Sequence, residues 1–454
     1  MAQPGASFAS DASRSVCIDD DHDDEDLFLD DSMMIENKSP ISKYLAEEEL
    51  GNEGLEGGDE QLEQDPSIDQ REPNPLAVVQ EGLLPEERRP ERYDQFTLDH
   101  IVRASVVAEV KEAHAVRAID LNLDGSQLVI GTNARALRVF DLVSPLSSAL
   151  STASSVSTRS SFPSPHHSCF LPLLPVLVER HKHHQSSIYC IAFNNSNSSR
   201  SSSAFGKTGG GGVIASGDAD SSIKVLSLVT NKDLLIQSHL GKIRALHFAA
   251  DNLLWSSATG DLRIRCWDLT TCTSSPVATP SSCMDLDGHV GEIQTLAFSF
   301  KSNVLLSASL DKTVRLWDTR SGKCERIVAR TAHPVFTLAF DPTTTGESRY
   351  FVSGHQDGSV AMWDLRMKSH PLQTLAHHQD ECRAISWSPD GKWLLSSSFD
   401  GTICFMQAQQ PHQLTPMASY HQHQDKVLQA QWHPTKPAIV TTGADKLVKL
   451  WAFS

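Results

Sequence analysis

The feature that most constrains this chain is a four-residue pattern that returns at fixed spacing. In its clearest copy, within residues 288–318, His289 precedes Ser307 by 18 residues, and Asp311 and Trp317 lie four and ten residues after that serine. The same spacing recurs in two further stretches, at His239, Ser257, Asp261 and Trp267 and at His423, Thr441, Asp445 and Trp451. Three agreements over four positions are improbable by chance, so we infer that the chain is built from internal repeats.

Seven copies of this unit follow one another along the chain. Their marker histidines are His114, His184, His239, His289, His333, His378 and His423. Each copy consists of short β-type runs separated by turn residues, which predicts several strands per unit. The first copy has Ala134 and Phe140 at the Asp and Trp positions, and the second and sixth have Leu226 and Met406 at the Trp position. The loop after His333 is short, so we expect this histidine not to reach its partners.

The Trp-Asp pairs at residues 267–268, 317–318 and 363–364 resemble the motif that closes each unit of the WD-repeat family. The resemblance implies an all-β, seven-bladed WD40 β-propeller whose His, Ser/Thr, Asp and Trp are hydrogen-bonded within one blade. Because a buried Asp is stabilised by such bonds, we interpret the repeated set as structural rather than as a hydrolase triad, and we expect no enzymatic activity. The last unit lacks an outer strand, which residues 103–110 are expected to supply.

The acidic residues of the chain are concentrated near its N-terminus. Residues 1–100 hold 28 of the 56 acidic side chains but only 7 of the 39 basic ones. Such a segment buries too little apolar area to offset an ordering entropy of about 1 to 2 kcal/mol per residue. We therefore expect residues 1–95 to form an acidic, mostly disordered arm, either a solvated tail or a segment that folds on a partner. Residues 96–454 would form the propeller, with inserts at about 143–168 and 195–212.

The WD resemblance also implies where partners bind. In WD propellers, residues three and five positions after each His, and the one before each turn Asp, surround the top of the central channel. The basic and aromatic residues at these or matching positions are Arg117, Tyr189, Lys242, Arg244, Phe336, Arg383, Phe399 and Lys426. Arg and aromatic side chains are typical of interface hot spots, and the positive balance favours an acidic peptide or tail as the partner. The alternative is that they are ordinary solvated loop ends.

A more specific resemblance concerns residues 101–454. The segments at 114–140, 187–193, 215–226 and 423–433 are similar to the propeller of the nemitin-like family of microtubule-associated WD-repeat proteins. This resemblance implies a non-enzymatic scaffold with cytoskeletal partners such as tubulin or microtubule-associated proteins. The helical dimerisation module of that family is not visible in residues 1–95, because long amphipathic helices are missing there.

A second functional hypothesis rests on two Trp-Asp-x-Arg boxes. They end at Arg320 and Arg366, in the fourth and fifth repeats. The boxes resemble those of WD proteins that serve as substrate receptors of cullin-RING ubiquitin ligases, in which the two arginines would face the ligase adaptor. This role is the alternative to the microtubule-linked scaffold.

Composition argues against several other classes of protein. The nine cysteines are odd in number and form no Cys-x-x-Cys pair, which favours reduced thiols over a disulfide framework or zinc site. The longest apolar run, residues 169–178, is short and broken by prolines, so we expect no membrane span. With 28 acidic and 32 basic residues, positions 101–454 lack a nucleic-acid-binding charge. We expect no metal, no cofactor and a cytoplasmic location, with the nucleus as the alternative.

Overall fold

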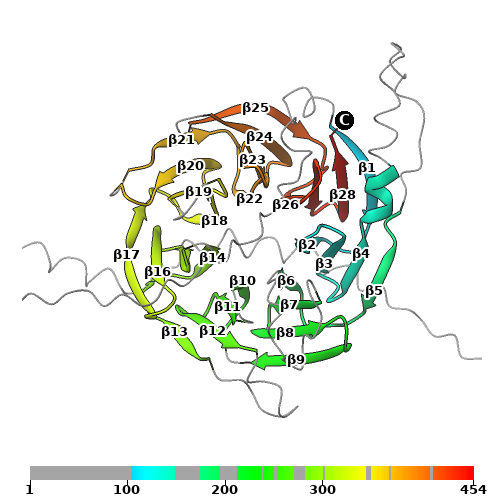
Figure 1. Cartoon of the computed structure of the whole chain (residues 1–454), viewed down its shortest axis with the longest axis horizontal. Coiled ribbons are helices and arrows are strands. Elements are labelled where there is room, and N and C mark those ends of the chain that lie inside the picture. The colour runs from blue at the N-terminus through cyan, green and yellow to red at the C-terminus, as the bar shows by residue number, and fades with distance from the viewer. Residues whose placement is uncertain are drawn as a thin grey trace, which may run out of the picture. The chain divides into compact units, whose positions relative to one another are not determined.

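Seven antiparallel sheets of four strands each surround a central axis (Figure 1). The computed structural model describes residues 104–148, 173–194, 212–237, 239–249, 253–269, 282–299, 302–343, 349–367, 370–409 and 413–453. Within each of blades 1 to 6 the chain runs from the axis outward, and the next blade begins again at the axis. The predicted seven-bladed propeller is therefore confirmed. The arm at residues 1–95 and most of both inserts lie outside the described residues.

Blades 1 to 3 follow in chain order. Blade 1 contains β2 (Val116–Leu121), β3 (Gln127–Thr132), β4 (Leu137–Asp141) and β5 (Val176–Arg180). Blade 2 contains β6 (Ile188–Phe193), β7 (Val213–Asp218), β8 (Ser222–Ser227) and β9 (Lys232–Gln237). Blade 3 contains β10 (Ile243–Phe248), β11 (Leu253–Ala258), β12 (Ile264–Asp268) and β13 (Met284–Leu286). A short helix at residues 143–148 follows β4.

Blades 4 to 6 have the same order of strands. Blade 4 contains β14 (Ile293–Ser299), β15 (Val304–Ser309), β16 (Thr313–Asp318) and β17 (Lys323–Arg330). Blade 5 contains β18 (Val335–Phe340), β19 (Tyr350–His355), β20 (Ser359–Asp364) and β21 (Gln373–Ala376). Blade 6 contains β22 (Cys382–Trp387), β23 (Trp393–Ser398), β24 (Thr402–Gln409) and β25 (Gln413–His421).

Blade 7 joins the two ends of the described chain. It contains β26 (Val427–Trp432), β27 (Ala438–Gly443), β28 (Leu447–Ala452) and, as its outer strand, β1 (Ser105–Lys111). Strand β1 pairs antiparallel with β28, with Glu109 opposite Lys449 and Val110 opposite Val448. Each inner strand contacts the inner strands of both neighbouring blades, and β26 contacts β2. The expected closure by the segment before the first marker histidine is confirmed, and it covers the sheet edge that β28 would otherwise expose.

The core of the propeller lies between successive blades. The residue at the Trp position of each blade packs against the preceding blade, whichever apolar side chain it carries. In blade order these residues are Phe140, Leu226, Trp267, Trp317, Trp363, Met406 and Trp451. Their side chains are at most 4% exposed. Leu226 and Met406 are therefore apolar substitutions within the same interface, since position rather than the indole ring determines the packing.

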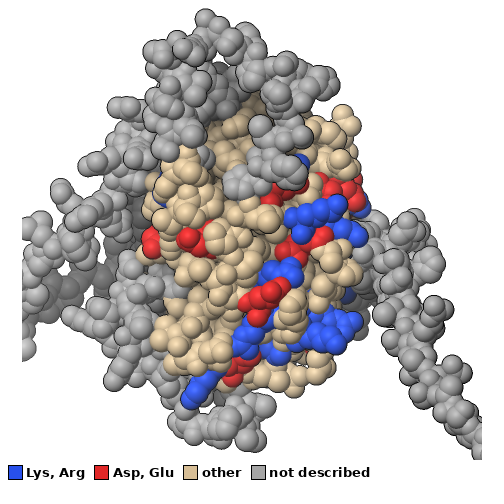
Figure 2. All heavy atoms as spheres, turned by 90° about the vertical axis from the view of Figure 1, so that its right-hand side faces the viewer, with Lys and Arg blue, Asp and Glu red and all other residues tan. Residues whose placement is uncertain are grey.

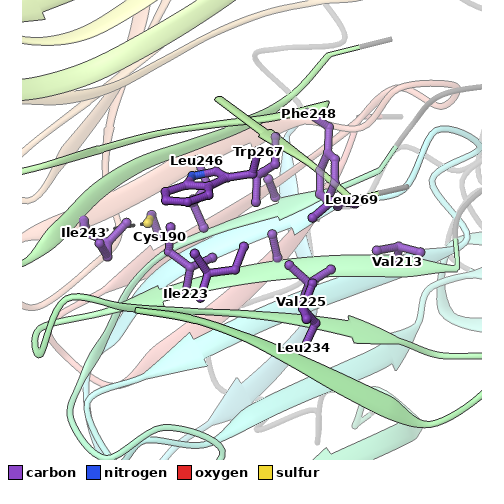
Figure 3. Packing of buried hydrophobic residues seen from close by; sticks show 14 of the residues in the cluster. Cys190, Val213, Ile223, Val225, Leu234, Ile243, Leu246, Phe248, Trp267 and Leu269 are labelled. Carbon is purple, nitrogen blue, oxygen red and sulfur yellow. Dashed lines mark hydrogen bonds between the residues drawn. The ribbon is translucent and has the colours of Figure 1, made fainter. Parts of the chain in front are cut away.

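The interface between blades 2 and 3 illustrates this packing (Figure 3). Trp267 and Leu246 of blade 3 lie over Ile223 and Val225 of blade 2. Burying a large apolar side chain completely contributes about 1.5 to 3 kcal/mol. Seven such interfaces, repeated around a closed ring, hold the inner strands in place and thereby fix the loops at both ends of the channel.

Candidate functional site

The hydrogen bonds in blades 4 and 7 join the residues that the repeat spacing predicts. In blade 4, His289 Nδ1 lies 2.8 Å from Asp311 Oδ2 and its Nε2 lies 2.7 Å from Ser307 Oγ. The Trp317 indole N–H donates to the same serine at 2.8 Å. The matching residues of blade 7 are His423, Asp445, Thr441 and Trp451. Each set connects a loop, a turn and two strands of one sheet.

Blade 3 requires a correction of the predicted serine. His239 Nε2 and Trp267 Nε1 contact Ser256 Oγ, at 2.6 and 2.7 Å, whereas Ser257 Oγ is buried and has no hydrogen-bond partner among the described residues. The cause is a longer turn. Ser256 pairs with Arg265 nine positions ahead, but in blade 4 the equivalent Ser307 pairs with Arg315 eight positions ahead. One additional residue in the turn therefore moves the serine back by one.

In blades 2 and 5 a residue of the second strand takes a role that the repeat gives to another position. His184 Nδ1 lies 3.0 Å from the carboxylate of Asp218, the last residue of β7. The repeat spacing instead assigns this contact to Asp220 in the following turn. In blade 5, His355 Nε2 lies 2.9 Å from Ser353 Oγ, which also accepts the indole N–H of Trp363 at 2.8 Å. His355 and Asp218 each lie two positions after the serine, so they project from the same side of the strand.

His333 remains outside the network of blade 5, as its short loop predicts. Its side chain is 51% exposed, and its Nε2 lies 3.7 Å from Asp357 Oδ2. The repeat spacing missed His355, although the sequence Ser-Gly-His at residues 353–355 contains the signal, a second histidine on the serine face of the strand.

Blade 1 replaces the missing His–Asp pair by an ion pair. Buried Glu112, two residues before His114, bonds Arg138 of β4, and Arg138 also bonds Glu179 of β5 at 2.6 Å. In blade 6, His378 Nε2 bonds Ser396 Oγ at 2.8 Å and its Nδ1 faces Thr402 and Asp400, while Met406 occupies the Trp position. The blades thus use different chemistry at equivalent positions, and in blade 5 the bonds described above join strand residues only.

The His–Asp pairs of these networks stabilise the blades and lie inside them. Burial alone would raise the pKa of Asp311, but hydrogen bonds from His289 and Thr313 hold that pKa well below its usual range. The carboxylate therefore stays ionised and accepts bonds from two chain segments. Its side chain is only 3% exposed, so no substrate reaches it. The arrangement fits the structural role predicted for the repeated set.

The top face, formed by the loops that enter each first strand and by the turns between second and third strands, carries the eight predicted binding residues. Three cationic groups surround one ring there. The Arg117 guanidinium carbon lies 4.7 Å from the Tyr189 ring centroid, Arg244 lies 5.5 Å away, and Lys242 Nζ lies 5.6 Å away. We call these four residues, from three consecutive blades, the tyrosine cluster. Arg117 Nε also donates to Asn133 Oδ1 at 3.0 Å, which orients its guanidinium.

A second group, the phenylalanine cluster, gathers residues of blades 5 to 7. Arg383 lies 4.2 Å from the ring of Phe336 and 4.4 Å from the ring of Phe399, and Lys426 Nζ lies 4.7 Å from Phe399. Glu381, which occupies the position three residues after His378, forms an ion pair with Arg383 at 2.9 Å, so this cluster also contains a carboxylate. Cation–π contacts of this kind contribute about 0.5 to 2 kcal/mol each and restrict the rotamers of the long side chains.

Below the top loops lies a cavity of about 460 Å³, lined by the inner strands β2, β6, β10, β14, β22 and β26. Tyr189 and Arg244 belong to both the tyrosine cluster and the cavity wall. Asp120 also lines the cavity, and burial raises its pKa. The top face is thus a rim of cationic and aromatic side chains around a polar channel.

Arg320 and Arg366 lie at the opposite end of the blades, just after the third strands β16 and β20. Both side chains are exposed, Arg366 to 62%. The backbone N–H groups of Arg320 and Arg366 donate to the side chains of Asp318 and Asp364, and these bonds fix the two turns. The two arginines therefore share a face of neighbouring blades, separate from the top.

The remaining surface shows mixed charge. On the side seen in Figure 2, basic side chains form an oblique band with acidic ones among them. Two cross-strand ion pairs, Arg138–Glu179 at 2.6 Å and Arg180–Asp233 at 3.1 Å, are of this alternating kind. A duplex-binding footprint is dominated by Lys and Arg, so this face does not resemble one.

The described ranges hold neither a cluster of metal ligands nor a helix that could cross a membrane. They contain no group of three or more His, Cys, Asp or Glu side chains arranged to hold a metal ion. Burial lowers the pKa of His183 to about 3, and its neighbour His184 is bound to Asp218 and Ser216. None of the helices described is long and apolar enough to cross a membrane.

Comparison with known proteins agrees with the repeat architecture. The family model described as "WD domain, G-beta repeat" matches residues 176–227, 280–318, 322–364, 369–405 and 414–452. Periodic tryptophan protein 2 of Arabidopsis thaliana is 28% identical over 201 residues, 42% of this chain and 20% of that protein. Anaphase-promoting complex subunit cdc20 of Dictyostelium discoideum is 30% identical over 102 residues, 22% of this chain and 20% of that protein.

A third relative, polyadenylation factor subunit 2 of Cryptococcus neoformans, is 28% identical over 109 residues, 24% of this chain and 15% of that protein. The chain spans at most a fifth of the length of these three relatives. The names of the second and third refer to two different cellular functions, the anaphase-promoting complex and polyadenylation. What they share with this chain is therefore the repeat unit.

Proposed function

Since the chain belongs to the WD40-repeat family, whose propellers generally act as non-enzymatic interaction scaffolds, we propose that it binds protein partners on its top face. The observation that carries the proposal is the presence of two cation–aromatic clusters, centred on Tyr189 and Phe399, on opposite sides of the channel mouth. Arg and Tyr are among the residues that supply most binding energy at protein interfaces.

The charge of the clusters favours an acidic partner. Arg117, Lys242 and Arg244 bring three positive charges to one ring, and Arg383 with Lys426 bring two to another. A stacked guanidinium keeps its N–H groups in a fixed plane, so a carboxylate can bind it with little further loss of entropy. Acidic side chains of a peptide or tail would complement this positive charge.

The test is affinity purification of partners with the full chain and a triple variant, Arg117→Ala, Arg244→Ala and Arg383→Ala. We expect the variant to lose most captured partners. The control removes the same charge from exposed lysines elsewhere, with Lys232→Ala, Lys323→Ala and Lys392→Ala. If the arginine triple variant recovers as many partners as the lysine control variant and the wild type do, the partners bind another surface.

We further propose a cytoplasmic, microtubule-linked role, supported by the resemblance of residues 101–454 to nemitin-like propellers. The three relatives described above carry other names, so this part of the proposal depends on the resemblance alone. An acidic segment on such a partner would suit the charge of the top face. Co-sedimentation of the full chain with taxol-stabilised microtubules tests the role, and failure to pellet with them at low salt would refute a direct interaction.

The alternative function is a substrate receptor of a cullin-RING ubiquitin ligase. The supporting observation is that Arg320 and Arg366 are both exposed on neighbouring blades, at the end opposite the top. An adaptor bound there would leave the top face available for a substrate. Arg320→Ala with Arg366→Ala should abolish co-purification of the adaptor but not of top-face partners. An adaptor that never co-purifies with the wild type excludes this function.

A further inference from the structure

Exposed apolar side chains lie beside the tyrosine cluster. Leu240 is 66% exposed, Leu262 is 42% exposed and Val290 is 69% exposed. All three belong to top loops of blades 3 and 4, and we call them the apolar rim. Leu240 is two residues from Lys242 of the tyrosine cluster, so both features share one loop. Large apolar side chains grouped at a surface mark interaction sites more often than scattered single ones do.

A backbone hydrogen bond and an ion pair connect the loops that carry the three residues of the apolar rim. The Gly260 N–H donates to the Leu240 carbonyl at 2.9 Å, which joins the entry loop of blade 3 to the turn that carries Leu262. Arg263, the next residue, forms an ion pair with Asp287 at 2.7 Å and so connects that turn to the entry loop of blade 4. Val290 lies in the same loop as Asp287. These contacts join the loops that carry the apolar rim across two neighbouring blades.

The two clusters differ in how their cations are arranged. The tyrosine cluster gathers three cations around a single ring, and in the phenylalanine cluster Arg383 forms an ion pair with Glu381 at 2.9 Å. Several cations close to one another attract an acidic side chain more strongly than a single cation does. Of the two clusters, the tyrosine cluster is the one that borders the apolar rim, because Leu240 and Lys242 share one loop.

We propose that the tyrosine cluster and the apolar rim together bind one extended peptide segment of a partner protein, in which a run of acidic residues adjoins a large apolar residue. This inference rests on the proposed function and specifies its partner chemistry. Carboxylates of the segment contact Arg117, Lys242 and Arg244, and the adjoining apolar side chain covers Leu240 and Val290. The combination explains why charge and apolar surface occur in the same loop. A compact polyanion would use only the first of them.

The experiment uses the full chain and three fluorescein-labelled ten-residue peptides in anisotropy titrations. One peptide carries four acidic residues followed by Leu and Phe, the second has Ser in place of Leu and Phe, and the third has Asn and Gln in place of the acids. The test variant is Leu240→Ser with Val290→Ser. The control variant is Leu123→Ser, which changes a leucine that is 43% exposed on the opposite face.

We expect the first peptide to bind about tenfold more tightly than the second, since burying one large apolar side chain contributes at least that factor. The third peptide should bind most weakly. The double variant should lower affinity for the first peptide to that of the second and leave the second unchanged. Leu123→Ser should change neither. Because the substituted side chains are exposed, the variants retain the interblade core and remain interpretable.

Equal affinity for the first and second peptides, or a double variant that binds the first peptide as wild type does, would overturn the inference. So would displacement of label by tripolyphosphate combined with equal binding of both acidic peptides, because that pattern indicates a small-polyanion site. A negative result in the peptide titrations can be distinguished from a failure of the proposed top-face function. If the Arg117, Arg244 and Arg383 triple variant still loses its protein partners, the top face binds proteins of different chemistry.

Discussion

Gln431 and Asp120 are 311 positions apart in the chain, and the side-chain amide of Gln431 donates a hydrogen bond of 2.9 Å to the Asp120 carboxylate. The other oxygen of Asp120 accepts the backbone N–H of Phe193 at 2.7 Å. A single carboxylate therefore connects the inner strands of blades 7, 1 and 2. It acts on the inner strands, whereas the β1–β28 pairing acts on the outer edge.

We predict that Asp120→Ala lowers the free energy of unfolding by about 2 to 4 kcal/mol, because the Phe193 N–H and the Gln431 amide lose their acceptor. Urea unfolding followed by tryptophan fluorescence measures the change. The control is Asp124→Ala in the exposed turn after the same strand, which should cost less than about 1 kcal/mol. Unfolding midpoints that coincide for Asp120→Ala and wild type would show that the link does not contribute to closure.

The two adjacent serines of blade 3 should differ sharply. Ser256→Ala removes the hydroxyl that His239 and Trp267 contact and should destabilise the protein by about 1 to 3 kcal/mol. Ser257→Ala removes a buried hydroxyl that has no hydrogen-bond partner among the described residues, so its effect should lie within about 0.5 kcal/mol of zero or be stabilising. Thermal melts of both variants test this ranking, and the reverse order would restore the serine that the repeat spacing predicts.

Blade 5 offers a matched pair of histidines. His355→Ala should lower stability by about 2 kcal/mol, because His355 is buried and its ring bonds Ser353. His333→Ala should have an effect below about 0.5 kcal/mol, since its side chain is half exposed and lies 3.7 Å from Asp357. Chemical denaturation of the two variants distinguishes them. A larger loss for His333→Ala would mean that the marker histidine of the repeat retains its function in this blade.

Repeat spacing was sufficient to predict the number of blades, the closing strand and the residues at the Trp position. These follow from sequence because every blade repeats the same offsets along a strand of period two. The WD resemblance, applied to the repeat positions, was the basis for assigning Arg117 and Tyr189 to the top face. Their stacking distance of 4.7 Å depends on two separate blades and has no local sequence signal.

Spacing failed where two residues could satisfy the same rule. Ser256 and Ser257 are adjacent serines, and only the length of the following turn decides which of them faces His239. Asp218 and His355 lie two positions beyond a strand serine, on its own face, and therefore compete with the turn Asp and the loop His that the repeat predicts. In these cases a hydrogen bond from a nearer position on the strand replaces one from a more distant loop.

The ion pair of blade 6 should make stability depend on pH. His378 Nδ1 lies 3.5 Å from Asp400 Oδ2. Burial by itself would lower the pKa of His378, but hydrogen bonds to Asp400 and Cys404 outweigh it and raise this pKa from the ordinary 6.5 to about 9. A histidine whose folded pKa is raised stabilises the fold fully below pH 6.5, and this contribution is lost as the pH rises through 9. We therefore expect the stability difference between wild type and His378→Gln to shrink by up to about 3 kcal/mol between pH 6 and pH 9.5.

Urea unfolding at a series of pH values from 6 to 9.5 measures this difference directly. His333→Gln serves as the control, because its side chain is half exposed and lies outside the network of its blade. The difference between wild type and the control should stay constant within about 0.5 kcal/mol over the range. If the His378→Gln difference is equally constant, then His378 is neutral in the folded protein at pH 7, and blade 6 is held by a neutral hydrogen bond to Ser396 and Thr402 instead of an ion pair.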